Sequence, residues 1–357
     1  MKYFRANLAI AAIVVALACA AVIAPRFAFG WSDDEFEHRP LYAYPLPQGR
    51  DNIIGNLITY RVQKGDTLLD VGRWFGLTAV EISEANGKLD WWSPPVGKDI
   101  LLPDEKILPD TPHVGIILNI PEMRLYYYYP SPTGPLLGKG TLTKASWTPH
   151  KGQPRPEVVY TFPVGLGRFD WKTPIGAFTV RGKTENPTWV VPDDIYEEHL
   201  ERDGEADHVI DGGDPDNPLG LFRIELTLPE YALHGTNIPW GIGMEVSHGC
   251  VRLYPEDIDR LFHKVKVGTP GEFIYQPIKF GWRGDDLYVE VHDDLYGRYP
   301  GLWAHAVSEV NRLGLSTSVD YQKLAKAVEE KTGVPTYIMP GPNPPNSTVS
   351  AAASSGN

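Results

Sequence analysis

Short runs of β-branched and aromatic residues, separated by glycine and proline, fill the middle of the chain. Between residues 113 and 277 they include "VVYTFPVGLG", "GAFTVRGKT", "LFRIELTL", "YALHGT" and "GEFIYQPI". The chain of 357 residues contains 35 glycines and 33 prolines, which is above average usage and indicates many turns. Strand-forming runs between turn residues are typical of all-β sheets and sandwiches. We therefore expect a mainly β protein with a β-sandwich-like domain over residues 113–277.

A hydrophobic segment at the start of the chain predicts export. Lys2 and Arg5 precede an uninterrupted apolar run over residues 8–24. A basic start, an apolar stretch and small residues before a cleavage point are the features of a signal peptide, which we expect over residues 1–30 with cleavage after Gly30. The 17 apolar residues are near the lower limit for a membrane span, so an uncleaved anchor is an alternative.

The charge and the cysteine count restrict the partners and the chemistry. The formal charge is -12, and removal of residues 1–30 takes away three basic residues and no acid to give about -15, so nucleic acid is not an expected partner. Of the two cysteines, Cys19 lies in the predicted signal, where a lipid anchor is a weaker alternative. Cys250 then has no pairing partner. A single thiol kept outside the cytoplasm suggests a chemical use, with a small buried hydrophobe as the other interpretation.

A strand–helix–helix–strand order is predicted over residues 58–104. "TYRV" alternates as a short strand, Thr67 can cap a helix that Gly76 stops, and a second helix over 78–85 precedes the closing strand "DILLP".

This segment resembles a LysM module over residues 59–103. The matching features are "Y-V-KGDTL" at the start, an asparagine after the second helix and "PVG-I-LP" at the end. LysM modules bind glycans that contain N-acetylglucosamine, so the resemblance implies attachment to peptidoglycan. Trp74, Trp91 and Trp92, taken singly, are more typical of ordinary core or surface aromatics. The candidate glycan-binding residues are Gly65, Asp66, Thr67 and Asn86.

Three segments are expected to lack regular structure. Residues 31–57 mix proline, aromatic and charged residues without a period, as an extended leader or linker would. Residues 104–112 form a charged, proline-bearing linker. Residues 193–217 are rich in Asp and Gly but lack the EF-hand spacing, so we expect a solvated loop.

A small subdomain is expected at the C-terminal side, over residues 280–340. The strand-like run "DLYVEVHDD" leads there to helical patterns over 303–313 and 320–331. The polar, proline-rich residues 341–357 are expected to be a disordered tail.

The segment "YALHGTNIPWGIGMEVSHGCVRL" brings together the residues of a nucleophilic site. His234 stands at the end of a predicted strand, and Cys250 follows after a loop rich in glycine that can return the chain to that strand. A thiol of ordinary pKa needs a base at neutral pH, and imidazole is the usual one. Gly249 permits a tight turn in which backbone N–H groups can meet a carbonyl oxygen. Arg252 can hold a thiolate or a substrate carboxylate, or form a structural ion pair. No second pair of ligands with zinc spacing is present, so neither a metal nor a cofactor is expected.

The same segment closely resembles the active-site signature of the YkuD-type L,D-transpeptidases. "HGTN", nine residues and "SHGCVRL" match it, and "TPIGAFTV", "NPTWVVP" and "NPLG" occur upstream in the family's order. The resemblance covers 113–277 and implies that Cys250 attacks, that His234 is the acid and base, and that the Gly235 carbonyl orients its ring. His248, with Ser247 and Gly249, would support the pocket and the oxyanion. Many members have asparagine where this chain has Arg252, and this departure matches the periplasmic, LysM-bearing branch of ErfK-like enzymes.

The resemblance implies a peptidoglycan enzyme in the periplasm. It would cleave the bond between diaminopimelate and D-Ala of a tetrapeptide stem through a thioester, and pass the acyl group to another diaminopimelate or to the lysine of a Braun-type lipoprotein. Sensitivity to carbapenems is implied as well. A hydrolase that uses water as acceptor, namely an L,D-carboxypeptidase or a lipoprotein-releasing enzyme, remains an alternative. A catalytically inactive scaffold that binds peptidoglycan is the alternative of another class.

Overall fold

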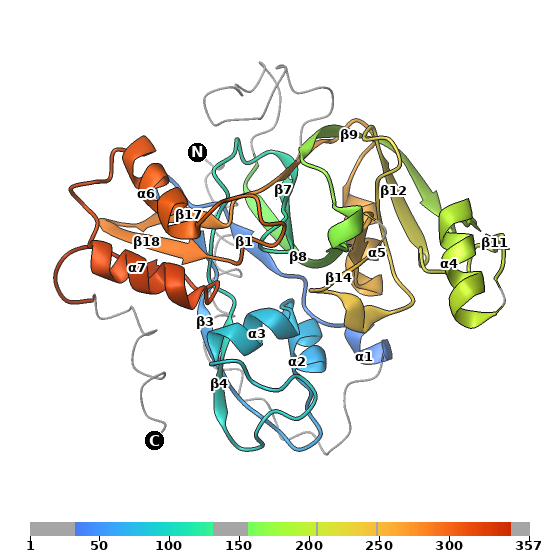
Figure 1. Cartoon of the computed structure of the whole chain (residues 1–357), viewed down its shortest axis with the longest axis horizontal. Helices are drawn as coiled ribbons and strands as arrows, with labels where there is room; N and C mark the ends of the chain where they lie inside the picture. Colours follow the sequence, from blue (N-terminus) through green and yellow to red (C-terminus); the bar gives the residue numbers. More distant parts are fainter. Residues whose placement is uncertain (1–32, 131–155, 205, 248, 344–357) are drawn as a thin grey trace, which may run out of the picture.

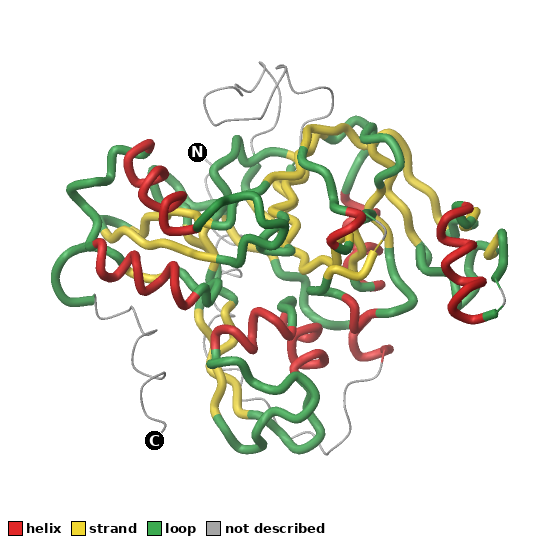
Figure 2. The backbone as a smooth tube through the Cα atoms, in the orientation of Figure 1, coloured by secondary structure: helices red, strands yellow, loops and turns green. Residues whose placement is uncertain are grey.

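The computed structural model describes residues 33–130, 156–204, 206–247 and 249–343 (Figure 1). The predicted signal peptide, His248 and nearly all of the predicted tail lie outside the described residues. Within the described ranges, the structure contains no helix with the length and apolar character that a membrane crossing needs. Strands predominate around the centre of the molecule, and helices lie at its periphery (Figure 2).

The central feature is a sheet that closes on itself. Its strands follow the order β8-β15-β13-β12-β9-β16-β6-β7, and β7 pairs again with β8. The closed ring was not foreseen, but the mainly β class and the sandwich-like domain are confirmed. The ring consists of β6 (Gly115–Asn119), β7 (Arg124–Tyr129), β8 (Val158–Gly167), β9 (Gly176–Glu185), β12 (Phe222–Leu226), β13 (Ala232–His234), β15 (Val251–Leu253) and β16 (Pro270–Ile274).

The main hydrophobic core fills the inside of this ring. Alternate residues of the strands point inward, as the period of two along a strand requires. Helix α5 (Pro255–Lys264) adds Ile258 and Leu261, which are fully buried in the same core. Burying these side chains is the main favourable contribution to the fold. Further members of this core are Leu118, Leu125, Phe162, Val164, Val180, Ile224, Leu233, Val251 and Phe273.

The leader packs on the central sheet, which corrects the prediction that residues 31–57 are an extended leader or linker. Strand β1 (Ala43–Pro45) pairs with β8, and β2 (Ile53–Ile54) pairs with β5 (Lys106–Ile107). The outer faces of β6, β7 and β8 are also apolar, and a second core beneath the leader covers them. Short pairings of two or three residues leave no periodic signal, so the sequence did not reveal them. The short helix α1 (Asp33–Glu37) precedes these strands, and Phe36 in it is buried.

The predicted strand–helix–helix–strand order is present below the ring (Figure 1). Its elements are β3 (Leu57–Arg61), α2 (Leu68–Phe75), α3 (Ala79–Ala85) and β4 (Asp99–Pro103). The Thr67 side chain caps α2, and Gly76 ends it with a φ of 64°. A capping box formed by Thr78 and Glu81 begins α3. The LysM assignment of this unit stays a prediction.

The C-terminal subdomain has the two helices that were predicted. A three-stranded sheet of β17 (Ile278–Arg283), β18 (Asp286–Val291) and β19 (Thr336–Tyr337) packs against α6 (Leu302–Arg312) and α7 (Tyr321–Glu330) around its own core.

The structure corrects the prediction that the acidic residues 193–217 form a solvated loop. It contains a helix, α4 (Asp193–Asp203), beside the small sheet of β10 (Trp189–Val190) and β11 (Val209–Ile210), at the far right of Figure 1. Acidic residues in the first turn of α4 interact favourably with the helix dipole, and Gly204 ends the helix in the left-handed conformation. The helix has little apolar surface, so the hydrophobic periodicity of the sequence does not predict it.

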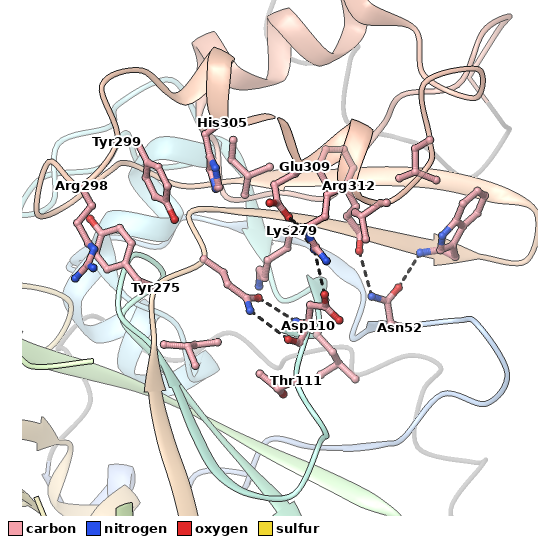
Figure 3. A pocket seen from close by; sticks show the side chains of 18 of the residues that line it. Asn52, Asp110, Thr111, Tyr275, Lys279, Arg298, Tyr299, His305, Glu309 and Arg312 are labelled. Carbon is pink, nitrogen blue, oxygen red and sulfur yellow. Dashed lines mark hydrogen bonds and ion pairs between the residues drawn. The ribbon is translucent and has the colours of Figure 1, made fainter. Parts of the chain in front are cut away.

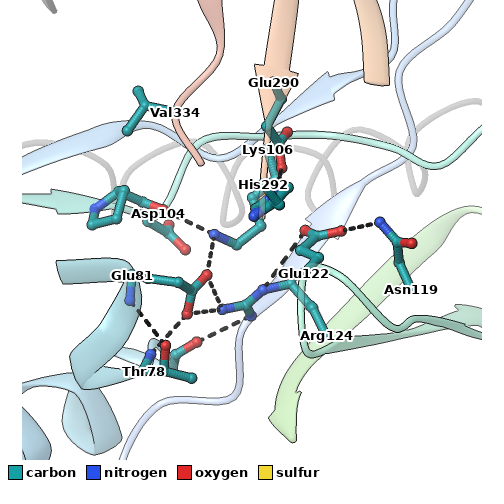
Figure 4. Close-up of polar contacts among 12 residues, drawn as sticks. Thr78, Glu81, Asp104, Lys106, Asn119, Glu122, Arg124, Glu290, His292 and Val334 are labelled. Atoms are coloured by element: carbon teal, nitrogen blue, oxygen red, sulfur yellow. Dashed lines mark hydrogen bonds and ion pairs between the residues drawn. The ribbon is translucent and has the colours of Figure 1, made fainter. Parts of the chain in front are cut away.

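Buried ion pairs join the three parts of the molecule (Figure 4). Glu81 of α3 accepts hydrogen bonds from Arg124 of β7 at 2.8 Å and from Lys106 of β5 at 2.9 Å. Residues 104–112 were predicted to be a charged linker without regular structure, but they contain β5, and Lys106 and its neighbours are buried. Lys279 of β17 contacts Glu122 at 2.8 Å, which places the C-terminal subdomain on the same network.

Candidate active site

The two predicted reactive residues lie next to each other in the sheet, because His234 ends β13 and Cys250 directly precedes the neighbouring parallel strand β15. Leu233 of β13 pairs with Val251 of β15, and His234 pairs with Arg252. Leu233 and Val251 point into the core, so the residues that alternate with them lie on the opposite face of the sheet. Cys250 directly precedes β15 and shares this face with His234 and Arg252. The loop between the strands, with the short helix η2 (Pro239–Gly241) and β14 (Glu245–Ser247), returns the chain as predicted.

His234 is held as a neutral base. Its side chain is buried, and Nδ1 lies 2.8 Å from the carbonyl oxygen of Gly235. An Nδ1–H group that donates to this carbonyl leaves Nε2 as an acceptor. Burial, together with the charges of Arg252 and Arg223, lowers the pKa of His234 to about 3, although the backbone carbonyls of Gly235 and Pro218 act in the opposite direction. The predicted contact with the Gly235 carbonyl is present, and the imidazole is neutral near pH 7.

The Cys250 thiol is partly buried beside the start of β13. Its Sγ lies 3.6 Å from the carbonyl oxygen of Glu230. Burial raises the pKa of the thiol above its ordinary value, while the backbone N–H of Ala232 and the charges of Arg223 and Arg252 act in the opposite direction. The resting side chain is therefore a thiol, with cationic groups already placed to stabilise a thiolate.

Two arginines flank His234, and the sequence analysis found only one of them. Arg223 of β12 pairs with His234 from one side, and Arg252 of β15 pairs with it from the other. The Nε atom of each guanidinium is buried without a hydrogen-bond partner in the described parts of the chain. The run "LFRIEL" predicts a strand, but only the register across three strands reveals that its arginine adjoins the histidine.

The turn before Cys250 requires glycine. Gly249 has a φ of 103°, and a Cβ there would lie 2.9 Å from the Tyr231 ring. The hydroxyl of Ser247 donates to the carbonyl oxygen of Cys250 at 2.6 Å, so Ser247 supports the turn. The predicted role of His248 falls outside the described residues.

Thr173 and Tyr296 hold this turn in place through hydrogen bonds, and neither was predicted from the sequence. The Thr173 hydroxyl donates to the Gly249 carbonyl at 3.0 Å and accepts from the N–H of Gly167 at 3.1 Å. The N–H of Thr173 donates to the Tyr296 hydroxyl at 3.2 Å, which in turn donates to the Gly167 carbonyl. Thr173 belongs to the motif "TPIG", but Tyr296 is 46 positions beyond Cys250 and gave no signal.

The candidate glycan-binding residues serve mainly the local structure of their module. Gly65 has a φ of 97° in a turn, and Asp66 accepts hydrogen bonds from the N–H of Gln63 and the hydroxyl of Tyr60. Asn86 bonds the backbone of Leu101 through both its oxygen and its nitrogen. Thr67 caps α2 and also lines a cleft that faces β13 and α5. Glycan binding by these residues stays a prediction.

A cavity of about 510 Å³ between the ring and the C-terminal subdomain contains none of the predicted site residues (Figure 3). Tyr299 and His305 stack there at 3.8 Å, and Arg312 contacts Asp110 at 3.2 Å. Nearby, Glu122, Glu290 and His292 are close enough to share a metal ion. The Lys279 ammonium contacts both glutamates at 2.8 Å and thus supplies the positive charge between them.

Comparisons with known proteins agree with this geometry. A family model described as the L,D-transpeptidase catalytic domain matches residues 143–273, which contain His234 and Cys250. The chain is 34% identical over 305 residues to "Probable L,D-transpeptidase YbiS" of Escherichia coli (strain K12), covering 83% of this chain and 91% of that protein. It is 32% identical over 308 residues to "Probable L,D-transpeptidase ErfK/SrfK" of the same strain, covering 84% and 91%.

Among solved structures, L,D-transpeptidase 3 from Mycobacterium tuberculosis is similar at 20% identity and a TM-score of 0.29, covering 45% of this chain and 61% of that chain. The identity to the two curated relatives, over most of both chains, confirms the resemblance to the L,D-transpeptidases. The chain therefore belongs to the L,D-transpeptidase family.

Proposed function

We propose that the protein is a peptidoglycan L,D-transpeptidase in which Cys250 is the nucleophile and His234 the general base and acid. The parallel register of β13 and β15 is the observation that supports this most directly, because it places both residues on one face of a rigid sheet. The neutral imidazole, held through its contact with Gly235, provides a proton acceptor for the thiol.

The reaction begins with transfer of the Cys250 proton to Nε2 of His234. The thiolate attacks the carbonyl carbon at the L-centre of diaminopimelate, and the backbone N–H groups of Gly249 and Cys250 stabilise the oxyanion. The intermediate collapses by breaking the C–N bond to D-Ala, whose amine takes the proton back from His234. An acceptor amine then loses a proton to His234 and attacks the thioester, which forms a new amide and restores the thiol.

Arg223 and Arg252 suit the carboxylates of the stem peptide. Two cations without an acidic partner in the described structure, one on each side of His234, form a site for an anion. A bound carboxylate would also offset the charges that lower the pKa of His234, so the imidazole would become a stronger base when substrate is present.

The acceptor and the location belong to the proposal as well. We place the enzyme in the periplasm, where the amine of another diaminopimelate or of a Braun-type lipoprotein lysine resolves the thioester. Exclusion of water from the thioester decides between transfer and hydrolysis.

Mass analysis of products from the purified protein and its Cys250→Ala variant tests the function. With disaccharide-tetrapeptide and a lipoprotein C-terminal peptide, we expect loss of D-Ala and a cross-linked product that only the wild-type protein forms. A carbapenem should add its mass to Cys250 alone. Release of D-Ala without any cross-link would identify a hydrolase. Absence of both the reaction and the adduct would identify an inactive scaffold.

The arginines are tested in the same assay. Arg223→Gln and Arg252→Gln should each raise KM about tenfold or more, because each removes a charge-assisted hydrogen bond to a carboxylate. Unchanged KM in both variants would contradict their role in binding the stem.

A further inference from the structure

The cavity of about 510 Å³ between the closed sheet and the C-terminal subdomain has the dimensions of a ligand site (Figure 3). Its volume is within the range of about 300–1,000 Å³ that is usual for sites that hold small organic molecules. Residues 274–282 and 298–315 contribute most of the walls, and Asn52 and Ile175 help to complete them. The described lining includes none of the residues proposed for the reaction, so its chemistry needs an explanation of its own.

Aromatic and apolar side chains form much of this lining. Ile278, Phe280 and Trp282 alternate along β17 and contribute to one wall. Beside α6, the rings of Tyr299 and His305 stack with their centroids 3.8 Å apart and an angle of 17° between their planes (Figure 3). Flat surfaces of this kind favour a ligand with an aromatic body.

The charge of the lining favours an anion. The chain carries a formal charge of -12, yet the lining holds more cationic than acidic side chains. Both acids, Asp110 and Glu309, already pair with Arg312, at 3.2 Å and 2.7 Å. Arg298 forms no ion pair within the described residues, and its guanidinium lies 5.4 Å from the centroid of the Tyr275 ring. An anion at Arg298 would therefore meet a cation that no carboxylate contacts.

Two polar groups next to this cation are available to a ligand. The Tyr299 hydroxyl and the His305 imidazole line the cavity and make no hydrogen bond within the described residues. Burial lowers the pKa of His305 below its ordinary value, although the charges of Glu309 and Asp294 act in the opposite direction, so the ring is neutral near pH 7. The imidazole then offers one N–H donor and one acceptor, and the phenol offers a donor.

The cavity shares a wall with the support of the turn before Cys250. The Tyr275 hydroxyl donates to Asp294 at 2.6 Å and accepts the N–H of Tyr296 at 2.7 Å. The Tyr296 hydroxyl accepts the N–H of Thr173, whose own hydroxyl bonds the turn. A ligand that packs on Tyr275 therefore contacts the first member of a hydrogen-bonded chain that ends beside Cys250.

We propose that this cavity binds a small carboxylate with an aromatic body, and that the bound ligand restrains the turn before Cys250. The carboxylate contacts Arg298, the aromatic body lies between β17 and the stacked rings, and Tyr275 carries the restraint to Tyr296. A free aromatic acid and the C-terminal residue of a peptide share this chemistry. Both parts are measured without peptidoglycan, so they stand or fall independently of the proposed function.

Calorimetry with N-acetyltryptophan tests the binding. We expect a Kd of about 0.1 mM, the ordinary affinity for a ligand of about 18 non-hydrogen atoms. N-acetyltryptophanamide lacks the charge and should bind about tenfold more weakly, and Arg298→Gln should weaken binding of the acid by about the same factor. Leu313→Trp should abolish binding, because the larger side chain fills the cavity from a partly exposed position. Arg61→Gln changes an exposed arginine outside the lining and is the control.

The tripeptide Gly-Gly-Trp distinguishes the two sources of such a ligand. Tighter binding of the tripeptide than of N-acetyltryptophan would assign the cavity to peptide ends, and weaker binding would assign it to free aromatic acids; both results agree with the proposal. Absence of binding, equal binding of the acid and the amide, or unchanged binding in both Arg298→Gln and Leu313→Trp would overturn it.

Alkylation of Cys250 by iodoacetamide at a fixed pH tests the restraint. Saturating N-acetyltryptophan should slow the reaction about two- to threefold, because a partly buried thiol reacts through local opening of its surroundings, which a bound ligand makes rarer. Tyr275→Phe keeps the ring but loses the hydroxyl, so it should bind the ligand as the wild type does and show no slowing. Equal slowing in Tyr275→Phe, or none in the wild type, would contradict the restraint.

Discussion

Cys250 and His234 occupy surroundings that keep both groups uncharged near pH 7, and alkylation of the thiol measures this. Burial raises the pKa of Cys250, so we expect the rate of reaction with iodoacetamide to rise with pH to a midpoint above about 8.5, the ordinary value. If Cys250 and His234 already formed a thiolate–imidazolium pair in the resting protein, the rate of alkylation would instead reach a plateau near pH 6. Arg252→Gln removes a charge that stabilises the thiolate, and should move the midpoint to still higher pH. Arg181→Gln, an exposed arginine paired with Glu225, is the control and should leave it unchanged.

The turn before Cys250, the proposed nucleophile, is positioned by elements on either side of it, and the Thr173 hydroxyl connects them. Thr173→Val should lower kcat about tenfold with little change in KM, because a misplaced nucleophile mainly affects the reaction step. Thr173→Ser keeps the hydroxyl and should retain kcat within about threefold. Tyr296→Phe should lower kcat in the same direction as Thr173→Val.

A fall in kcat caused by lower stability must be distinguished from one caused by displacement of the turn before Cys250. Thr269 is as buried as Thr173 and its hydroxyl also accepts a backbone N–H, but it precedes β16 and does not contact the turn. Thr269→Val should lower the melting temperature without lowering kcat. An equal fall of kcat in Thr269→Val and Thr173→Val would contradict a positioning role.

The whole molecule is held together by charges buried between its parts, and Glu81 is the centre of one group (Figure 4). Glu81→Gln would leave Arg124 and Lys106 buried without their counter-charge, so we expect the free energy of unfolding in urea to fall by about 3–5 kcal/mol. Glu330→Gln removes an exposed ion pair with Lys326 and should change the free energy of unfolding by less than about 0.5 kcal/mol. A loss in Glu81→Gln as small as in this control would show that the network adds little.

Acid should weaken the same network. The charges of Arg124 and Lys106 lower the pKa of Glu81 well below its ordinary 4.5. A group with a lowered pKa in the folded state contributes stability above its ordinary pKa and loses that contribution as the pH falls toward the folded value. Urea unfolding at pH 6 and pH 3 should therefore show a larger loss in the wild type than in Glu81→Gln. Equal losses would contradict this assignment.

The fold class could be predicted and candidate site residues could be named from the sequence, because both depend on local properties. Alternation along strands, helix caps at Thr67 and Gly76, and the spacing from His234 to Cys250 are all written within short stretches of sequence. The acidic helix α4 was missed because it is polar on most of its surface, and the leader strands were missed because they are too short to show a period.

The sequence by itself determined which residues are able to react, since a lone thiol, an imidazole at a strand end and a glycine before the nucleophile are matters of residue type and order. Only the tertiary structure decided what surrounds them. Arg223 reaches His234 through strand register, and Tyr296 reaches the nucleophile's turn from a distant part of the chain. A buried salt bridge between Arg73 and Glu256 joins α2 to α5, two elements that are far apart in the sequence. These contacts depend on packing between distant segments, which no local pattern encodes.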